Sequence, residues 1–138
     1  MLAHILFAAG GAIFGVLGTL HLVITFRGSR LHPYDAAVRD AMQATTLRMT
    51  RDTSLWKAWI GFNASHSMGA MVFAAFVLLL AIGYGDFLRS APLFAWLALA
   101  NSAAWLIVAQ RYWFRIPRNG LALATTCFLI AALMYSFG

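Results

Sequence analysis

The chain has 138 residues, of which 62% are hydrophobic and 10% are charged, and its formal net charge is +6 at pH 7. Soluble domains are about half apolar and about one quarter charged, so this composition excludes an ordinary soluble domain and indicates a membrane protein. The basic residues cluster in two connecting segments, which argues against a nucleic-acid partner and leaves the lipid bilayer as the expected one. Cys127 is the single cysteine, which excludes an intrachain disulfide and a multi-cysteine metal site.

Four apolar stretches follow one another along the chain, and each is close to the roughly 20 residues that a helix needs to cross the bilayer. They are continuous, without the alternation of a barrel strand. No basic residue precedes the first stretch, and it is longer than a usual signal core, so it is expected to be retained. The sequence predicts one all-α domain over residues 1–138, a four-helix transmembrane bundle. Its expected spans are residues 2–26, 58–82, 92–114 and 120–137.

The segment between the first two spans has about 30 residues, a length that is unlikely to be shapeless in a compact domain. Its LHPYD stretch is typical of a helix start, with Asp35 as the N-cap. We therefore expect a short amphipathic helix over residues 35–50, lying on the cytoplasmic interface. Asp52 or Thr53 is expected to begin the second span. The apolar stripe of the short helix is expected to hold Val38, Met42, Thr45 and Met49.

The distribution of charge predicts the orientation. Nine of the ten basic residues lie between spans one and two or between spans three and four, and only Arg89 falls on the other side. The positive-inside rule then places both basic segments in the cytoplasm. The expected location is a bacterial inner membrane, crossed several times, with both termini in the periplasm or outside.

Polar residues within the apolar stretches form a predicted layer in the cytoplasmic half. With a rise of about 1.5 Å per residue, His21 and Asn63 each lie roughly 9 Å from the nearest basic end of their span. His66 lies about one turn deeper, and ionisable side chains inside a bilayer usually face the protein interior or a cavity. The candidate ligand-binding residues are His21, Asn63, His66, Ser67, Gln110 and Arg111.

Three functions stay open for this layer. It could bind a hydrophobic or amphiphilic ligand, such as a lipid or a quinone, below a basic rim that includes Arg111. It could hold haem b between His21 and His66 as a cofactor for electron transfer, with Gly15 and Gly18 making room for the macrocycle. It could also be a hydrogen-bonded cluster that packs the helices of an accessory or scaffold subunit without chemistry.

Whether the chain is an enzyme stays open, because it has no nucleophile elbow, phosphate loop or paired carboxylates. Ser65 and Ser67 flank His66, but neighbours in a helix point away from one another and cannot form a triad. The carboxylates Asp35 and Asp40 lie in the loop, so no metal site is predicted. Two small-residue ridges would suit homo-oligomerisation or a larger membrane complex. They are Gly11, Gly15 and Gly18 in the first span and Gly61, Ser65 and Gly69 in the second.

The order HLVITF, LHPYD, TRDTSLWKAWIGFNASHSMGA and AQRYWFRIP resembles a bacterial family of small, four-span membrane proteins that has no established activity. The resemblance covers most of the chain. Its most specific part is the W-x-x-W-x-G-F-N-x-S-H-S pattern. It implies a four-helix integral membrane protein and assigns no catalytic residue.

Overall fold

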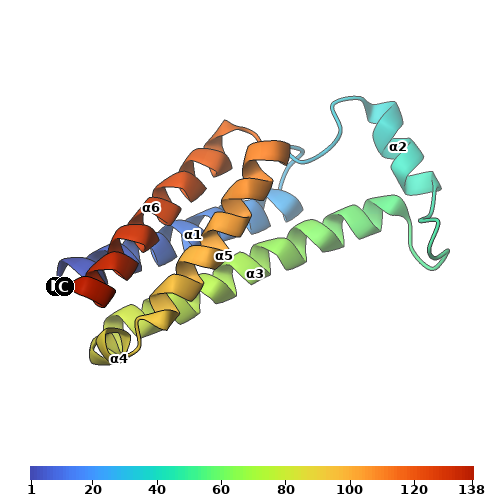
Figure 1. The fold of residues 1–138 in the computed structure, drawn as a ribbon. Helices are drawn as coiled ribbons and strands as arrows, with labels where there is room; N and C mark the ends of the chain where they lie inside the picture. The colour runs from blue at the N-terminus through green and yellow to red at the C-terminus, as the bar shows by residue number, and fades with distance from the viewer. The chain divides into compact units, whose positions relative to one another are not determined.

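The computed structural model describes residues 1–138 and contains six helices and no strand (Figure 1). Four of these helices are long and apolar enough to cross a membrane. The all-α class and the four predicted spans are therefore confirmed, and the chain is a multi-pass membrane protein. The helices are α1 (Leu2–Phe26), α2 (Ala36–Ala44), α3 (Leu55–Gly83), α4 (Gly85–Ser90), α5 (Leu93–Tyr112) and α6 (Arg115–Phe137).

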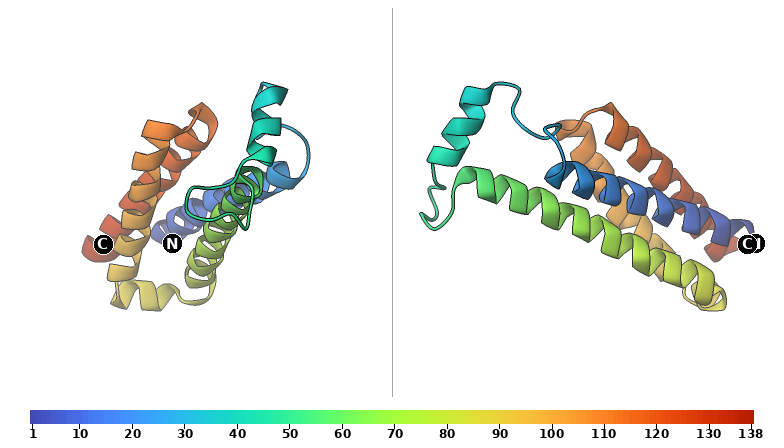
Figure 2. Two further views of the ribbon diagram at one scale, coloured as in Figure 1. Left: turned by 90° about the vertical axis from the view of Figure 1, so that its right-hand side faces the viewer. Right: turned by 180° about the vertical axis from the view of Figure 1, so that it is seen from behind.

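The chain divides into two compact units. The first, here called the core unit, comprises Met1–Leu17 and Ala70–Gly138, and the second, the loop unit, comprises Gly18–Gly69. The prediction of a single domain stays a prediction. Within the core unit, α5 and α6 lie antiparallel and side by side (Figures 1 and 2).

Two helices begin earlier than their apolar stretches, for local reasons. Ser54 caps α3, because its hydroxyl accepts a hydrogen bond from the Lys57 N–H at 3.3 Å. The expectation that Asp52 or Thr53 starts this helix is therefore wrong by one or two residues. In α6, Pro117 is the third helical residue. Proline is tolerated in a first turn, where its missing N–H would have no partner within the helix.

The short helix α4 lies between α3 and α5 and was not predicted. Its six residues carry Asp86 and Arg89, which form an exposed ion pair at 3.4 Å. Leu88 between them is fully buried. Two adjacent apolar residues, Phe87 and Leu88, in a six-residue segment give no helical period, which explains why the pattern of the sequence did not reveal this helix.

The core unit is held by aromatic side chains that gather around Phe14 of α1. The Phe14 ring lies 4.8 Å from Phe73 of α3 and 5.6 Å from Trp105 of α5, measured between centroids, and both contacts are edge-to-face. Phe128 of α6 lies 6.3 Å from Phe14 and is fully buried. Because Phe14 touches a ring from each of the other three long helices, the core unit is itself a four-helix bundle. Edge-to-face pairs are worth about 0.5–1.5 kcal/mol beyond their buried area.

Glycines of α1 allow this close packing. A Cβ atom added to Gly11 would lie 2.6 Å from Val77 Cγ1, and one added to Gly15 would lie 3.4 Å from Ala74 Cβ. Gly11 and Gly15 of the first predicted ridge thus lie inside the core unit, where the backbone of α1 meets α3. This is the role that small residues have between transmembrane helices.

The helix α2 is confirmed at its start and is shorter than expected at its end. Asp35 is the N-cap, and its carboxylate accepts a hydrogen bond from the Ala37 N–H at 2.8 Å. The helix ends at Ala44 rather than near residue 50, and Thr45 is extended. The physical reason is that the Thr45 carbonyl accepts a hydrogen bond from the Leu55 N–H at 3.0 Å, so it pairs with the start of α3 instead of continuing the helix.

Replacing Gly11 by alanine is expected to destabilise the protein by about 1–3 kcal/mol, because the new methyl group overlaps the rigid Cβ branch of Val77. The matched control is Gly83→Ala in α3, where an added Cβ meets nothing within 4 Å. Thermal unfolding in detergent micelles measures both variants. Equal melting temperatures for the two would contradict the close approach of α1 and α3.

Candidate functional site

The candidate site lies in the loop unit, where the second half of α1 meets the first half of α3. His21 Nε2 and Asn63 Oδ1 are 2.9 Å apart and form a hydrogen bond between the two helices. Asn63 is buried and His21 is half-buried. The sequence-based prediction that His21 and Asn63 lie at one depth agrees with this contact.

The hydrogen bonds of Asn63 also fix the roles of the His21 nitrogens. The Asn63 amide nitrogen donates to the Trp59 carbonyl at 2.8 Å, so the amide oxygen is the atom that faces His21. An oxygen of this kind can only accept, and therefore His21 Nε2 carries the proton. In the neutral imidazole, Nδ1 is then the acceptor. The site thus presents a nitrogen that can accept a hydrogen bond from a hydroxyl group.

His66 lies beside His21, one turn beyond Asn63 in α3. The two imidazole centroids are 5.5 Å apart with the rings inclined at 70°. Phe62 also stacks on His66, with centroids 6.2 Å apart and an angle of 18° between the rings. Two imidazoles and an amide therefore form a compact polar cluster, and an aromatic ring borders it. We call His21, Asn63 and His66 the histidine cluster.

Two hydroxyls near the histidine cluster bond to the backbone of their own helices. Ser67 is fully buried and donates to the Asn63 carbonyl at 2.8 Å, and Thr25 is buried and donates to the His21 carbonyl at 2.7 Å. In both bonds the hydroxyl donates to the carbonyl four residues earlier, as serine and threonine often do within helices. The Ser67 proton is therefore engaged with its own helix. The role of Ser67 as a ligand contact stays a prediction.

Gln110 and Arg111 are exposed residues near the end of α5 and belong to the core unit. Their place beside the histidines therefore stays a prediction. Within the core unit, a different polar pair links α5 to α6. The hydroxyls of Ser102 and Thr125 are 2.8 Å apart, and Thr125 also donates to the Leu121 carbonyl.

The histidine cluster does not fit a haem. Both histidines would have to direct a nitrogen at one iron from opposite faces of the macrocycle. Instead, His21 Nε2 is hydrogen-bonded to Asn63, and the two imidazoles meet each other edge-to-face with their centroids 5.5 Å apart. No group of three or more histidine, cysteine, aspartate or glutamate side chains is arranged to hold a metal ion.

A tryptophan network connects the histidine cluster to the loop, and the sequence reasoning did not include it. The Trp59 indole donates to the Leu31 carbonyl at 3.2 Å, and Trp56 meets the His32 ring at 4.9 Å between centroids, edge-to-face. Two tryptophans three residues apart share one helix face, and this signal could have suggested a common contact with the loop.

A second histidine of interest lies at the other end of α1, in the core unit. The His4 ring packs edge-to-face on Tyr135 with centroids 5.3 Å apart. His4 also covers Gly85, where an added Cβ would overlap its Nε2 atom. The packing brings the first turns of α1, the start of α4 and the end of α6 together.

The chain matches no protein-family model, no curated protein and no solved structure. The resemblance to a four-span bacterial family, based on the stretch from Trp56 to Ser67, therefore stays a prediction.

A double-mutant cycle tests the bond between His21 and Asn63. We expect His21→Phe and Asn63→Leu each to lower the free energy of unfolding, since each leaves the other side chain without its partner. Their coupling energy should be near the roughly 0.6 kcal/mol average of interhelical hydrogen bonds in membrane proteins and below about 1.7 kcal/mol. Unfolding in lipid–detergent micelles measures the cycle.

The control for this cycle pairs His21→Phe with Ser65→Ala. Ser65 is exposed and donates only to the Phe62 carbonyl of its own helix. These two changes should be additive. A coupling energy of zero for His21 and Asn63 would show that their bond does not hold the helices together.

Proposed function

We propose that the protein is a small membrane protein that binds an amphiphilic ligand, lipid-like or quinone-like, at the histidine cluster. One observation supports this proposal above all. Two half-buried imidazoles and a buried amide lie within apolar helices, and hydrogen bonds set the donor and acceptor atoms of His21 and Asn63. Polar side chains in membrane helices are costly and commonly mark a functional site.

The surroundings of the cluster suit a ligand with a polar head and an apolar body. Leu20 precedes His21 and is 57% exposed, and Phe62 beside His66 is 67% exposed. A carbonyl or hydroxyl group of the ligand would hydrogen-bond to the imidazoles, and its chain would lie along these apolar side chains. If the head is a quinone, an imidazole that hydrogen-bonds to it can also exchange a proton with it.

The test is to purify the protein in a mild detergent and to identify what stays bound by native and extract mass spectrometry. We expect the wild type to retain an amphiphile in stoichiometric amount and His66→Phe to lose most of it. This substitution keeps an aromatic ring and removes the hydrogen-bonding nitrogens. An absorption spectrum of the same sample should lack a Soret band, because the cluster does not fit a haem.

The matched control is His4→Phe, which makes the same chemical change at the other end of α1. It should retain the ligand as the wild type does, and melting curves of both variants check that they fold. A wild type without any stoichiometric amphiphile, or a His66→Phe variant that retains it fully, would refute the proposed binding site.

An accessory or scaffold role is the second candidate, and the ridge of Gly61, Ser65 and Gly69 on α3 favours it. All three residues are exposed, and a Cβ added to Gly61 or Gly69 meets nothing within 4 Å. An open ridge of small residues is the kind of surface on which another transmembrane helix packs closely. In the same native mass spectra, a second copy or a larger partner that is lost in Gly61→Leu would favour this role.

The orientation proposed for the chain has the basic loops in the cytoplasm and the termini on the opposite side of a bacterial inner membrane. It is supported by nine of the ten basic residues, which lie in the connections between α1 and α3 and between α5 and α6 or in the helix ends that flank them. The contact between His4 and Tyr135 also brings the two ends of the chain to one end of the core unit, as an even number of spans requires.

Cysteine labelling in intact cells tests this orientation, in a background where Cys127→Ala removes the native thiol. Tyr84→Cys, in the short outer connection, should react with a membrane-impermeant maleimide. Met49→Cys, in the basic loop, should react only after lysis. Both positions are exposed, at 61% and 90%. The reverse pattern would invert the proposed topology.

A further inference from the structure

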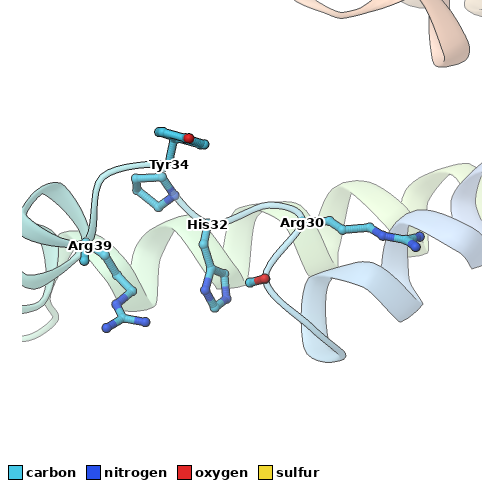
Figure 3. Close-up of a pocket in the computed structure, with 7 residues that line it drawn as sticks. Arg30, His32, Tyr34 and Arg39 are labelled. Carbon is cyan, nitrogen blue, oxygen red and sulfur yellow. The ribbon is translucent and has the colours of Figure 1, made fainter.

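The loop that joins α1 to α2 surrounds a cavity of about 530 Å³ (Figure 3). The cavity lies wholly within the loop unit and apart from the histidine cluster. Two arginines and one histidine are among its lining residues, and none of them is acidic. It is lined by Ser29, Arg30, His32, Pro33, Tyr34, Ala36 and Arg39.

The loop is fixed by contacts that do not involve a ligand. Its first turn uses Gly28 with a φ of 94°, a conformation that other residues rarely adopt. The Trp59 indole holds the Leu31 carbonyl, and Trp56 packs against His32. The cavity is therefore largely formed before anything binds, which lowers the entropic cost of binding.

The hydrogen-bond donors of the Arg39 guanidinium are only partly satisfied by the protein. Its Nε atom is buried and has no hydrogen-bond partner in the protein, and its Nη2 atom reaches only Asp40, at 3.5 Å. Figure 3 shows the side chains of Arg39 and His32 extending to the same side of the loop, whereas Tyr34 extends to the opposite side. The Arg30 side chain extends away from both. The cation at the cavity is thus Arg39, with His32 beside it.

A phosphate group is the chemistry that this arrangement suits. A guanidinium presents its donors as a planar fork that matches two oxygens of a phosphate. The imidazole of His32 can donate a further hydrogen bond to the same group. The N-terminus of α2 is not needed for this binding, because the carboxylate of Asp35 already caps it.

The position of the cavity in the chain identifies the source of the phosphate. The loop begins directly after Phe26, the last residue of the membrane-capable helix α1. Segments that close to the end of a span lie at the depth of the lipid headgroups. We propose that the cavity binds the phosphate of an anionic lipid headgroup, held by the Arg39 guanidinium and the His32 imidazole.

Lipid exchange followed by native mass spectrometry of the full-length protein tests this proposal. The protein is placed in nanodiscs that contain phosphatidylcholine alone or mixed with phosphatidylglycerol. We expect the wild type to retain phosphatidylglycerol in preference and Arg39→Gln to lower that preference about tenfold, since hydrogen bonds to charged groups are among the strong ones. Arg39→Lys keeps the positive charge but lacks the planar set of guanidinium donors, so it should lower the preference for phosphatidylglycerol by less than Arg39→Gln does.

The matched control is Arg48→Gln, which removes the same charge from the same unit at an exposed position outside the cavity. Equal losses in Arg39→Gln and Arg48→Gln would show general attraction to the membrane surface and overturn the proposal. Melting curves establish that each variant is folded. The His66→Phe variant should keep its preference for phosphatidylglycerol, so failure here and failure of the proposed function are distinguishable.

Inorganic phosphate separates the lipid from a soluble ligand. If millimolar phosphate protects the wild type but not Arg39→Gln against unfolding, and phosphatidylglycerol shows no preference, the cavity takes a soluble anion and the lipid assignment is wrong. If phosphatidylglycerol is preferred and added phosphate lowers that preference, both compete for one phosphate position, as the proposal requires.

Discussion

The constraint on which this structure depends is that hydrocarbon offers no hydrogen-bond partner to a polar group. Polar side chains in the long helices therefore tend to bond to their own helix or to a neighbouring one, although Asn101 Nδ2 and the Tyr135 hydroxyl are buried without a partner. Thr25 and Ser67 bond to the carbonyl four residues before them. His21 and Asn63 bond across α1 and α3, and Ser102 and Thr125 bond across α5 and α6. These bonds are individually weak, but they fix which residues of two helices lie opposite one another.

Packing in the core unit depends on shape. Lipid chains are as apolar as leucine, so association between transmembrane helices comes from van der Waals contact rather than from exclusion of water. The backbone of α1 approaches α3 closely at Gly11, and the large ring of Phe14 fills the space between four helices. On α1, Gly11 thus allows close approach to α3, and Phe14, three positions later, supplies contact area with all three other long helices.

Trp59 relates the two candidate sites of the loop unit. Its carbonyl accepts the hydrogen bond that orients Asn63, and its indole holds the Leu31 carbonyl beside the loop cavity. A change in the loop would act on the first turns of α3 through this residue, and from there on the amide that bonds His21. The histidine cluster and the cavity around Arg39 are separate in position, yet one side chain contacts the elements that form both.

The amino-acid sequence by itself determined the class of fold, because length and apolar composition of a segment decide whether it can cross a membrane as a helix. It also determined the cap of α2 at Asp35 and the common depth of His21 and Asn63, since capping is local and the helical rise is constant. These features depend on neighbours in the chain or on regular geometry.

Only the tertiary structure decided the rest. It showed that Asn63 bonds to His21, that α2 ends where Thr45 pairs with Leu55, and that Leu88 forms the buried side of α4. It also placed His32 and Arg39 on one side of the loop cavity. Each of these results depends on residues distant in the chain or on the path of an irregular loop. The periodicity of a sequence carries no information about either, because it records one helix at a time.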